Sequence, residues 1–187
     1  MGPAINLLAG FFWEDDSQGI VAGTLIVLSS GLWLIGLIGL YDRLKVNAPR
    51  YVAVALPVAV FATVGGLAFG FQGIYEGLFD VSHAEAIVQL NQHPLTAVSL
   101  YWIPGPLFPA TLFALGFMVA RLRHAPRTVG VLIMLGALAF PLSRITREPL
   151  IAHVADVLLL LPFLYLGVRS SWPRRAIRRS EEPSVSG

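Results

Sequence analysis

The sequence predicts an all-α protein: an integral membrane bundle of about five transmembrane helices, with its N-terminus outside and its C-terminus in the cytoplasm. Three observations predict this fold: the composition, the spacing of long apolar runs and the side on which basic residues fall. Of the 187 residues, 56% are hydrophobic and only 13% are charged, whereas a soluble domain carries about 25% charged residues. A soluble core cannot hide so much apolar surface, so lipid must cover part of it.

Five apolar runs supply the predicted spans. A helix rises 1.5 Å per residue, so about 20 residues cross a hydrocarbon core about 30 Å thick. The runs cover residues 19–40, 51–71, 100–120, 128–142 and 150–168. The fourth run is short for a span, so it needs the snorkelling side chains of Arg127 and Arg144 or a locally thin bilayer.

The runs divide the chain into three parts. Residues 1–18 form an N-terminal segment whose apolar stretch, 3–13, is too short to span and ends in three aromatic residues. This segment is expected in the membrane interface or over the bundle mouth. Residues 19–168 form the transmembrane domain. Residues 169–187 form a tail, basic and then acidic, which we expect to be disordered in the cytoplasm and able to touch anionic lipid headgroups.

One sizeable loop, residues 73–99, joins the second and third runs on the outer side. Within it, Ser82 is followed three residues later by Glu85. This is the pattern of a capping box, in which each side chain bonds the backbone N–H of the other residue at the start of a helix. The pattern predicts a short helix from His83 to Leu90 with its apolar face against the bundle mouth.

Basic residues gather on one side of the predicted bundle. Eleven of the thirteen follow the first or third run or lie in the tail: Arg43, Lys45, Arg50, Arg121, Arg123, Arg127, Arg169, Arg174, Arg175, Arg178 and Arg179. The other side holds Arg144 and Arg147, with Glu14, Asp15, Asp16, Glu76, Asp80, Glu85 and Glu148. Because basic residues are retained in the cytoplasm, the N-terminus is outside. Twelve of the thirteen are arginine, which indicates a GC-rich genome and hence a bacterial cytoplasmic (inner) membrane.

Small residues and prolines predict how the helices pack. Small residues recur on one helix face at Gly19/Gly23, Gly66/Gly70/Gly73/Gly77 and Gly116/Ala120. Such faces favour close helix contact; in the alternative, the second span ends against a ligand, because glycine lets a backbone approach closely. Pro104, Pro106 and Pro109 predict a broken start to the third span, which protein or a polar cavity at the outer face must accommodate.

Ionisable residues single out the outer half of the bundle. Asp156 lies about six residues into the fifth run, and His153, three residues earlier, shares its helix face. Gln72 and Glu76 are one turn apart at the outer end of the second run. An intramembrane charge is costly unless it is paired, and such residues often mark a functional site.

We therefore expect one outer-leaflet ligand site. Its predicted residues are Gln72, Tyr75, Glu76, Tyr101, Trp102, Arg144, Arg147, His153 and Asp156. In the structural alternative, Arg144 or Arg147 neutralises Asp156 and staples the fourth span to the fifth. A structural ion pair produces the same sequence pattern as a functional site.

A metal or haem site has fewer ligands than it needs. His153, Asp156 and Glu76, joined by a loop histidine, can bind zinc, manganese or iron, but di-iron bundles use two Glu-x-x-His helices and only one comparable pair exists here. Bis-histidine haem needs a second facing histidine, and His124 is predicted on the cytoplasmic side. No metal site is predicted and the cofactor is left unassigned. The absence of cysteine excludes disulfides and thiolate ligands.

The C-terminal part contains three distinctive segments: Gly-Phe-Met-Val-Ala-Arg-Leu-Arg-His-Ala-Pro-Arg, Gly-Ala-Leu-Ala-Phe-Pro-Leu-Ser-Arg-Ile and Ala-His-Val-Ala-Asp-Val-Leu-Leu-Leu. In these segments, over roughly the last 70 residues, the chain resembles small multi-spanning membrane proteins of unknown function from high-GC Gram-positive bacteria. The resemblance implies a helical membrane fold and a bacterial source. It brings no activity and no cofactor.

The favoured functional hypothesis is a binding protein whose outer-leaflet site takes a lipid-like or isoprenoid-like molecule. In it, Arg144 and Arg147 meet an anionic head, while Trp102 and the glycine face of the second span meet the apolar body. This hypothesis uses the outer residues without demanding ligands that the sequence lacks.

Two alternatives stay open. One is a membrane enzyme or redox protein that uses His153, Asp156 and Glu76 for proton transfer or metal binding. The other is a structural or accessory subunit of a membrane complex. The expected partners are the lipid bilayer, a lipid-like small molecule, and another membrane protein or a second copy of the chain. No nucleic acid is expected among them.

Overall fold

The computed structural model describes residues 1–14, 18–123, 125–146 and 148–170. Sequence predictions that involve Asp15, Asp16, His124 or Arg147 lie outside the described residues. The same holds for the tail from residue 171 onward, including its predicted disorder and lipid contacts.

Most of the described chain is helical, and it contains no strand. Its helices are α1 (Gly2–Ala9), α2 (Gly19–Leu44), α3 (Pro49–Phe79), α4 (His83–Asn91), α5 (Pro94–Ala97), α6 (Pro104–Leu122), α7 (Arg127–Thr146) and α8 (Pro149–Ser170), with a 3₁₀ turn η1 (Gly10–Phe12) and a π-helical turn η2 (Val98–Trp102). Five stretches are long and apolar enough to cross a membrane: Gly19–Leu44, Pro49–Phe79, Pro94–Leu122, Arg127–Arg144 and Pro149–Arg169. The predicted all-α membrane bundle with five spans is confirmed.

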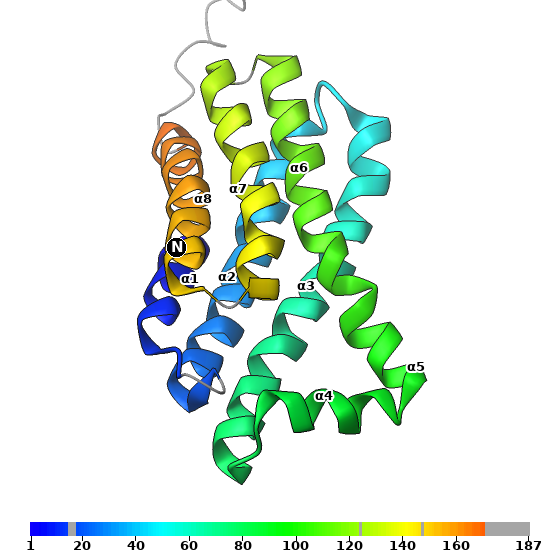
Figure 1. The fold of residues 1–187 in the computed structure, drawn as a ribbon. Helices are drawn as coiled ribbons and strands as arrows, with labels where there is room; N and C mark the ends of the chain where they lie inside the picture. Colours follow the sequence, from blue (N-terminus) through cyan, green and yellow to red (C-terminus); the bar gives the residue numbers. More distant parts are fainter. Residues whose placement is uncertain (15–17, 124, 147, 171–187) are drawn as a thin grey trace, which may run out of the picture.

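The long helices lie side by side and enclose one apolar core (Figure 1). Helix α2 packs against α3, α3 against α6, α6 against α7, and α7 against α8. The largest fully buried side chains in the core include Tyr41, Leu37, Leu112, Ile133 and Leu159. Because lipid is as apolar as leucine, close packing rather than exclusion of water must hold such helices together.

Glycine provides that close packing at two helix crossings. A Cβ atom added at Gly23 would lie 2.6 Å from the Gly70 carbonyl oxygen, so α2 and α3 touch backbone to backbone. A Cβ at Gly116 would likewise lie 2.7 Å from the Gly130 carbonyl oxygen, between α6 and α7. The glycine face of α3 meets α2 and Gln18 just before it. The predicted helix contacts are therefore present, and this face is not open to the apolar body of a ligand.

The third span begins irregularly, as its prolines predict. Helix α5 leads into the π-helical turn η2, and α6 starts at Pro104 with Pro109 inside it. A proline in the first turn costs no hydrogen bond, because that N–H has no helical partner. The start of α6 is buried against α3, where a Cβ at Gly65 would lie 2.9 Å from the Pro104 carbonyl carbon. Protein packing therefore accommodates the irregular backbone here.

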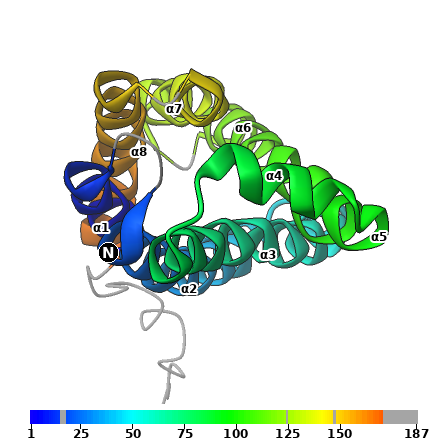
Figure 2. The ribbon, with the colours of Figure 1, turned by 60° about the horizontal axis from the view of Figure 1, so that its bottom comes forward.

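The N-terminal segment packs along the side of the bundle. Helix α1 lies against α2 and α8, and Figure 2 shows it between them when the bundle is turned to bring the lower end forward. Gly2 lies against Trp33, near the middle of α2, and its carbonyl accepts a hydrogen bond from Ser29 Oγ at 2.8 Å. Instead of lying over the bundle mouth, this segment runs down the side of the bundle and positions the residues of α1 beside α8.

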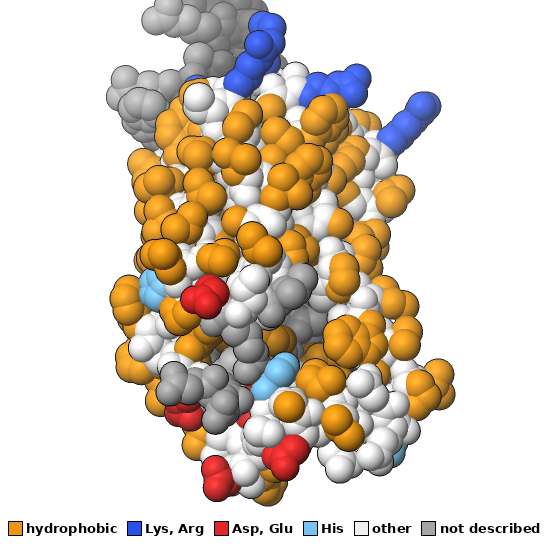
Figure 3. Space-filling model, in the orientation of Figure 1, with side chains coloured by type: hydrophobic (Ala, Val, Ile, Leu, Met, Phe, Trp, Pro, Cys, Tyr) orange, Lys and Arg blue, Asp and Glu red, His pale blue; other side chains and the backbone are white. Residues whose placement is uncertain are grey.

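Charged side chains separate between the two ends of the bundle. The described basic residues other than Arg144 gather at the end that holds the α2–α3 and α6–α7 connections and the C-terminus of α8, at the top of Figure 3. Acidic and histidine side chains appear toward the opposite end, where α4 crosses (Figure 3). We call this second end the acidic end.

Candidate functional site

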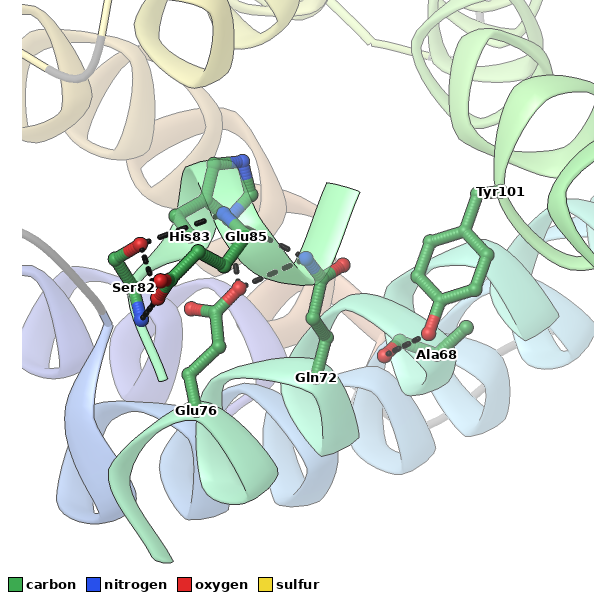
Figure 4. A network of polar contacts seen from close by, with 7 residues as sticks. All are labelled: Ala68, Gln72, Glu76, Ser82, His83, Glu85 and Tyr101. Carbon is green, nitrogen blue, oxygen red and sulfur yellow. Dashed lines mark hydrogen bonds and ion pairs between the residues drawn. The ribbon is translucent and has the colours of Figure 1, made fainter. Parts of the chain in front are cut away.

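The structure divides the predicted outer site into two groups of polar side chains at the acidic end. The first joins α3 to α4 and consists of Gln72, Glu76 and His83 (Figure 4); we call it the Glu76 cluster. The second surrounds the lower parts of α1, α7 and α8 and consists of Asn6, Trp13, Arg144, His153 and Asp156; we call it the Arg144 cluster. Phe69 of α3 links the two groups, since it contacts Arg144 one turn before Gln72.

The Glu76 cluster is formed by short contacts around one carboxylate. Glu76 Oε1 accepts a hydrogen bond from Gln72 Nε2 at 2.8 Å and lies 2.7 Å from His83 Nδ1. Gln72 and Glu76 are four residues apart on α3, so the predicted shared face is present. Glu76 is only 3% exposed, and a buried carboxylate needs such donors to offset its lost hydration. These contacts supply them.

Helix α4 begins with the predicted capping box. The Glu85 N–H donates to Ser82 Oγ at 3.3 Å, and the Ser82 N–H donates back to Glu85 Oε2 at 3.1 Å. Hydrogen bonds from the Ser82 hydroxyl and N–H lower the pKa of the Glu85 carboxyl. No residue of α4 is buried. Among the described side chains, His83 joins this helix to α3 through its contacts with Glu76 at 2.7 Å and Gln72 at 3.3 Å.

The Arg144 cluster contains a hydrogen bond that joins the first described helix of the chain to the last. Asn6 Nδ2 of α1 donates to Asp156 Oδ1 of α8 at 2.6 Å, and both side chains are buried. The sequence prediction missed Asn6. The available signal was that Asn6 is the lone polar residue in the otherwise apolar segment before Trp13, and an amide there needs a partner once it is buried.

Arg144 lies among aromatic rings. Its guanidinium carbon is 4.9 Å from the ring centre of Trp13, 4.8 Å from that of Phe140 and 5.5 Å from that of Phe69. These distances are within the range of cation–π attraction. Within the described residues, Arg144 makes no hydrogen bond or direct ion pair, and its Nε atom is buried without an acceptor. Asp156 acts on Arg144 only as a nearby charge.

His153 has one nitrogen engaged and one without a partner. Its Nδ1 is 2.6 Å from the Pro149 carbonyl oxygen, which can only accept, so Nδ1 bears the proton. Its Nε2 is buried and has no hydrogen-bond partner within the described residues. The ring packs on Phe11, with ring centres 4.2 Å apart, and against Gly10. In the neutral ring, Nε2 therefore presents a lone pair beside the apolar end of α1.

Within the described residues, the aromatic residues predicted for the site make no ring contact with Arg144. Tyr75 stacks on Phe79 and is 56% exposed. The Tyr101 hydroxyl donates to the Ala68 carbonyl at 3.4 Å, between η2 and α3 (Figure 4). Trp102 is 49% exposed. The rings that meet Arg144 are instead those of Trp13, Phe69 and Phe140, which the prediction did not include because only packing brings them together.

The two alternative interpretations of the outer residues also change. Arg144 and Asp156 form no direct ion pair, and Asp156 bonds Asn6 of α1. The staple through Arg144 is therefore not a direct ion pair, and the staple through Arg147 stays a prediction. Arg147 lies outside the described residues. For metal binding, no group of three His, Asp or Glu side chains within the described chain is placed to hold an ion, since Glu76 belongs to the other cluster.

A cavity of about 340 Å³ opens at the opposite, basic end, lined by Asp42, Arg43, Lys45 and Val46. It is remote from both clusters and contains none of the predicted site residues. No protein-family model, curated protein or solved structure matches the chain. The resemblance to small bacterial membrane proteins therefore stays a prediction, and function must be argued from the clusters themselves.

Proposed function

We propose that this protein binds a lipid-like or isoprenoid-like amphiphile at the acidic end of the bundle, with the anionic head of the ligand on Arg144. The observation that carries the proposal is the state of Arg144, which has three aromatic neighbours and no hydrogen-bond acceptor within the described residues. The proposal retains the predicted head-binding role of Arg144 and does not depend on Arg147.

Electrostatics supports an anionic ligand. An arginine at the centre of a spanning helix costs ~3 kcal/mol on insertion scales and less toward the interface. Aromatic faces offset part of such a cost, with about 0.5–2 kcal/mol for a cation–π contact. The aromatic faces do not, however, provide oxygen acceptors for the N–H groups of the guanidinium, and the buried Nε has no acceptor within the described residues. A carboxylate or phosphate head satisfies two of them at once, because its oxygens match the planar fork of arginine.

The surroundings suit an amphiphile rather than a free ion. Phe69, Phe140 and Trp13 offer apolar contacts next to the guanidinium. Large hydrophobic side chains are also exposed on the same helices, including Leu142 of α7 and Phe71 of α3. A head on Arg144 with its tail along such surfaces keeps the charge near the interface and the tail in lipid, as in snorkelling side chains.

The proposal includes a membrane orientation. We place the acidic end outside and the basic end, with the C-terminus, in the cytoplasm, because positively charged loops are retained on the cytoplasmic side. We assign the protein to a bacterial cytoplasmic membrane on the basis of its arginine-rich composition. On this assignment, the ligand enters from the outer leaflet.

Native mass spectrometry of the full chain, extracted in mild detergent, tests the proposal. Wild-type protein is expected to retain an amphiphile that denaturation releases. In Arg144→Gln, the amount of amphiphile retained per protein is expected to fall at least tenfold. Arg121→Gln is the matched control, because Arg121 is exposed at the basic end. Equal retention by both variants would show that Arg144 is not the head-binding residue. A co-purifying polypeptide in place of an amphiphile would favour the accessory-subunit alternative.

A proton-transfer function is the second candidate, and His153 favours it. Its Nδ1–H is fixed on the Pro149 carbonyl while Nε2 presents a lone pair, which is the arrangement of a general base. Asp156, one turn further on, is bonded to Asn6. If this candidate is correct, His153→Gln abolishes turnover of the amphiphile recovered from the wild type while leaving its binding intact.

A further inference from the structure

We infer that the head bound by Arg144 carries a single negative charge, as a phosphodiester or a carboxylate does, and that amphiphiles with a diphosphate head are rejected. This inference rests on the proposed function and names the chemical class of its ligand. It follows from the charges and donors around Arg144 rather than from Arg144 alone.

The first argument is the number of cationic donors that the described residues offer a ligand at the acidic end, which is one guanidinium, that of Arg144. The rings of Trp13, Phe69 and Phe140 lie 4.8–5.5 Å from the guanidinium carbon of Arg144. Their faces attract the charge but bring no oxygen acceptor, so an oxyanion must bind the N–H groups of the guanidinium. One edge of a guanidinium makes two parallel N–H···O bonds to one carboxylate or phosphate group. A diphosphate presents a second charged group that needs its own cation, commonly Mg²⁺ or a further Lys or Arg.

The second argument is the nearest charge. Asp156 acts electrostatically on Arg144 without pairing with it directly. Its Oδ1 is held by Asn6, so the carboxylate is fixed near the site and cannot swing away without breaking a buried hydrogen bond. One anionic group on Arg144 is compatible with this neighbour. Each additional negative charge on the head meets Asp156 in a medium that screens it poorly.

The third argument is the charge of the whole outer side. Its segments contain two arginines, Arg144 and Arg147, against eight carboxylates: Glu14, Asp15, Asp16, Glu76, Asp80, Glu85, Glu148 and Asp156. Figure 3 shows acidic side chains exposed at this end. A surface of this sign repels a multiply charged anion before it reaches the site. The basic end carries positive side chains, so a site for polyanionic heads would be expected there and not at the acidic end.

The experiment measures binding of four defined amphiphiles to the full chain in detergent by native mass spectrometry. The probes are dioleoyl phosphatidylglycerol, oleate, farnesyl diphosphate and, as an uncharged control, dioleoylglycerol. Each is titrated against wild type, Arg144→Gln and Asp156→Asn. We expect phosphatidylglycerol or oleate to bind at least tenfold more tightly than farnesyl diphosphate, with binding lost in Arg144→Gln. The stronger of the two identifies a lipid phosphodiester or a fatty-acid carboxylate as the source of the charge.

The possible failures are distinguishable. If farnesyl diphosphate binds as tightly as the singly charged probes and Arg144→Gln abolishes its binding, the charge inference is wrong and the proposed function stands. If no anionic probe binds more tightly than dioleoylglycerol, or Arg144→Gln changes nothing, the proposed function itself is wrong. Asp156→Asn keeps the size of the side chain. In this variant, the ratio of the affinities for the singly charged probes and for farnesyl diphosphate is expected to fall at least threefold. An unchanged preference would exclude Asp156 as its source.

Discussion

The Glu76 cluster and the Arg144 cluster contain similar residue types at the same end of the bundle, yet their polar groups are satisfied differently. Glu76 Oε1 accepts a hydrogen bond from Gln72 at 2.8 Å and contacts His83 at 2.7 Å. Arg144 is bordered by aromatic rings and has no acceptor for its buried Nε within the described residues. The first cluster therefore has the character of a structural tether for α4. The second is the cluster to which we assign the anion in the proposed function.

The two clusters also differ in how far apart their members lie in the sequence. Gln72 and His83 are separated by 11 residues, whereas Asn6 and Asp156 are separated by 150. Local contacts form as soon as α3 and α4 form. The bond between Asn6 and Asp156 requires α1 and α8 to be packed together. Loss of a polar group in the second cluster should therefore affect the whole bundle, and loss in the first should affect α4 alone.

The largest effect on stability is expected from Asn6→Ala. It removes the hydrogen-bond donor of a buried carboxylate, and leaving such a group unsatisfied costs about 3 kcal/mol. The measurement is the free energy of unfolding in detergent with increasing denaturant. The control is Asn91→Ala, an exposed position on α4, which should change stability by less than about 0.5 kcal/mol. Equal effects of the two variants would mean that Asn6 does not hold α1 to α8.

Arg144→Gln should separate binding from stability. The ligand-free variant is expected to lose about 1–2 kcal/mol with the cation–π contacts of Arg144. This is less than the roughly 3–5 kcal/mol that breaking a buried ion pair costs, because no direct pair is broken. Phosphatidylglycerol at one hundred times its Kd should raise the free energy of unfolding of the wild type by about 2.7 kcal/mol. This increase should vanish in the variant. Melting curves with and without phosphatidylglycerol measure both quantities. A ligand-free loss above 3 kcal/mol would instead support the staple between α7 and α8.

His83→Ala tests the tether in the Glu76 cluster. Loss of the contact with Glu76 is expected to lower stability by about 1–2 kcal/mol and to speed amide hydrogen exchange in His83–Asn91 while the five spans stay protected. His93→Ala is the matched control, since His93 is exposed beyond the end of α4. Faster exchange throughout the bundle would contradict the local role assigned to this cluster.

The same contrast explains what the sequence could predict. Apolar runs and charge alternation predict the five spans because hydrophobic length is a property of the chain itself. The capping box at Ser82 and the shared face of Gln72 and Glu76 are equally local, since fixed helical spacing decides them. These predictions are confirmed. The fourth candidate span, Arg127–Arg144 within α7, begins and ends with the two arginines proposed to lengthen its short apolar run.

The composition of the site could not be predicted in this way. Which aromatic ring meets Arg144 depends on how α3, α7 and the N-terminal segment pack, and no spacing rule specifies that. The sequence predicts His83 as the first residue of a short helix but not its partner; it contacts Glu76 because the capping box starts α4 at that residue. The role of Asn6 could not be predicted from spacing, because a single amide in an apolar segment does not indicate which residue becomes its partner. Such contacts follow from burial, which requires polar groups to find partners once the helices have packed.

Ser82→Ala gives the smallest effect and refines the account of α4. Loss of an N-cap serine costs about 1 kcal/mol of local helix stability, which hydrogen exchange within α4 should detect. Ser99→Ala serves as a control away from any cap.

Hydrogen bonds from Ser82 lower the pKa of Glu85 below its ordinary value of 4.5. A lowered pKa means that the capping contribution is present above pH 4.5 and is lost as the pH falls through the folded-state value. Wild-type α4 should therefore begin to fray on the acidic side of pH 4.5. In Ser82→Ala this dependence should be reduced, because the Glu85 carboxylate loses the hydrogen bond from the hydroxyl and keeps only the one from the backbone N–H of residue 82. If both proteins lose protection equally with acid, the pH dependence of α4 belongs to the Glu76 cluster and not to its cap.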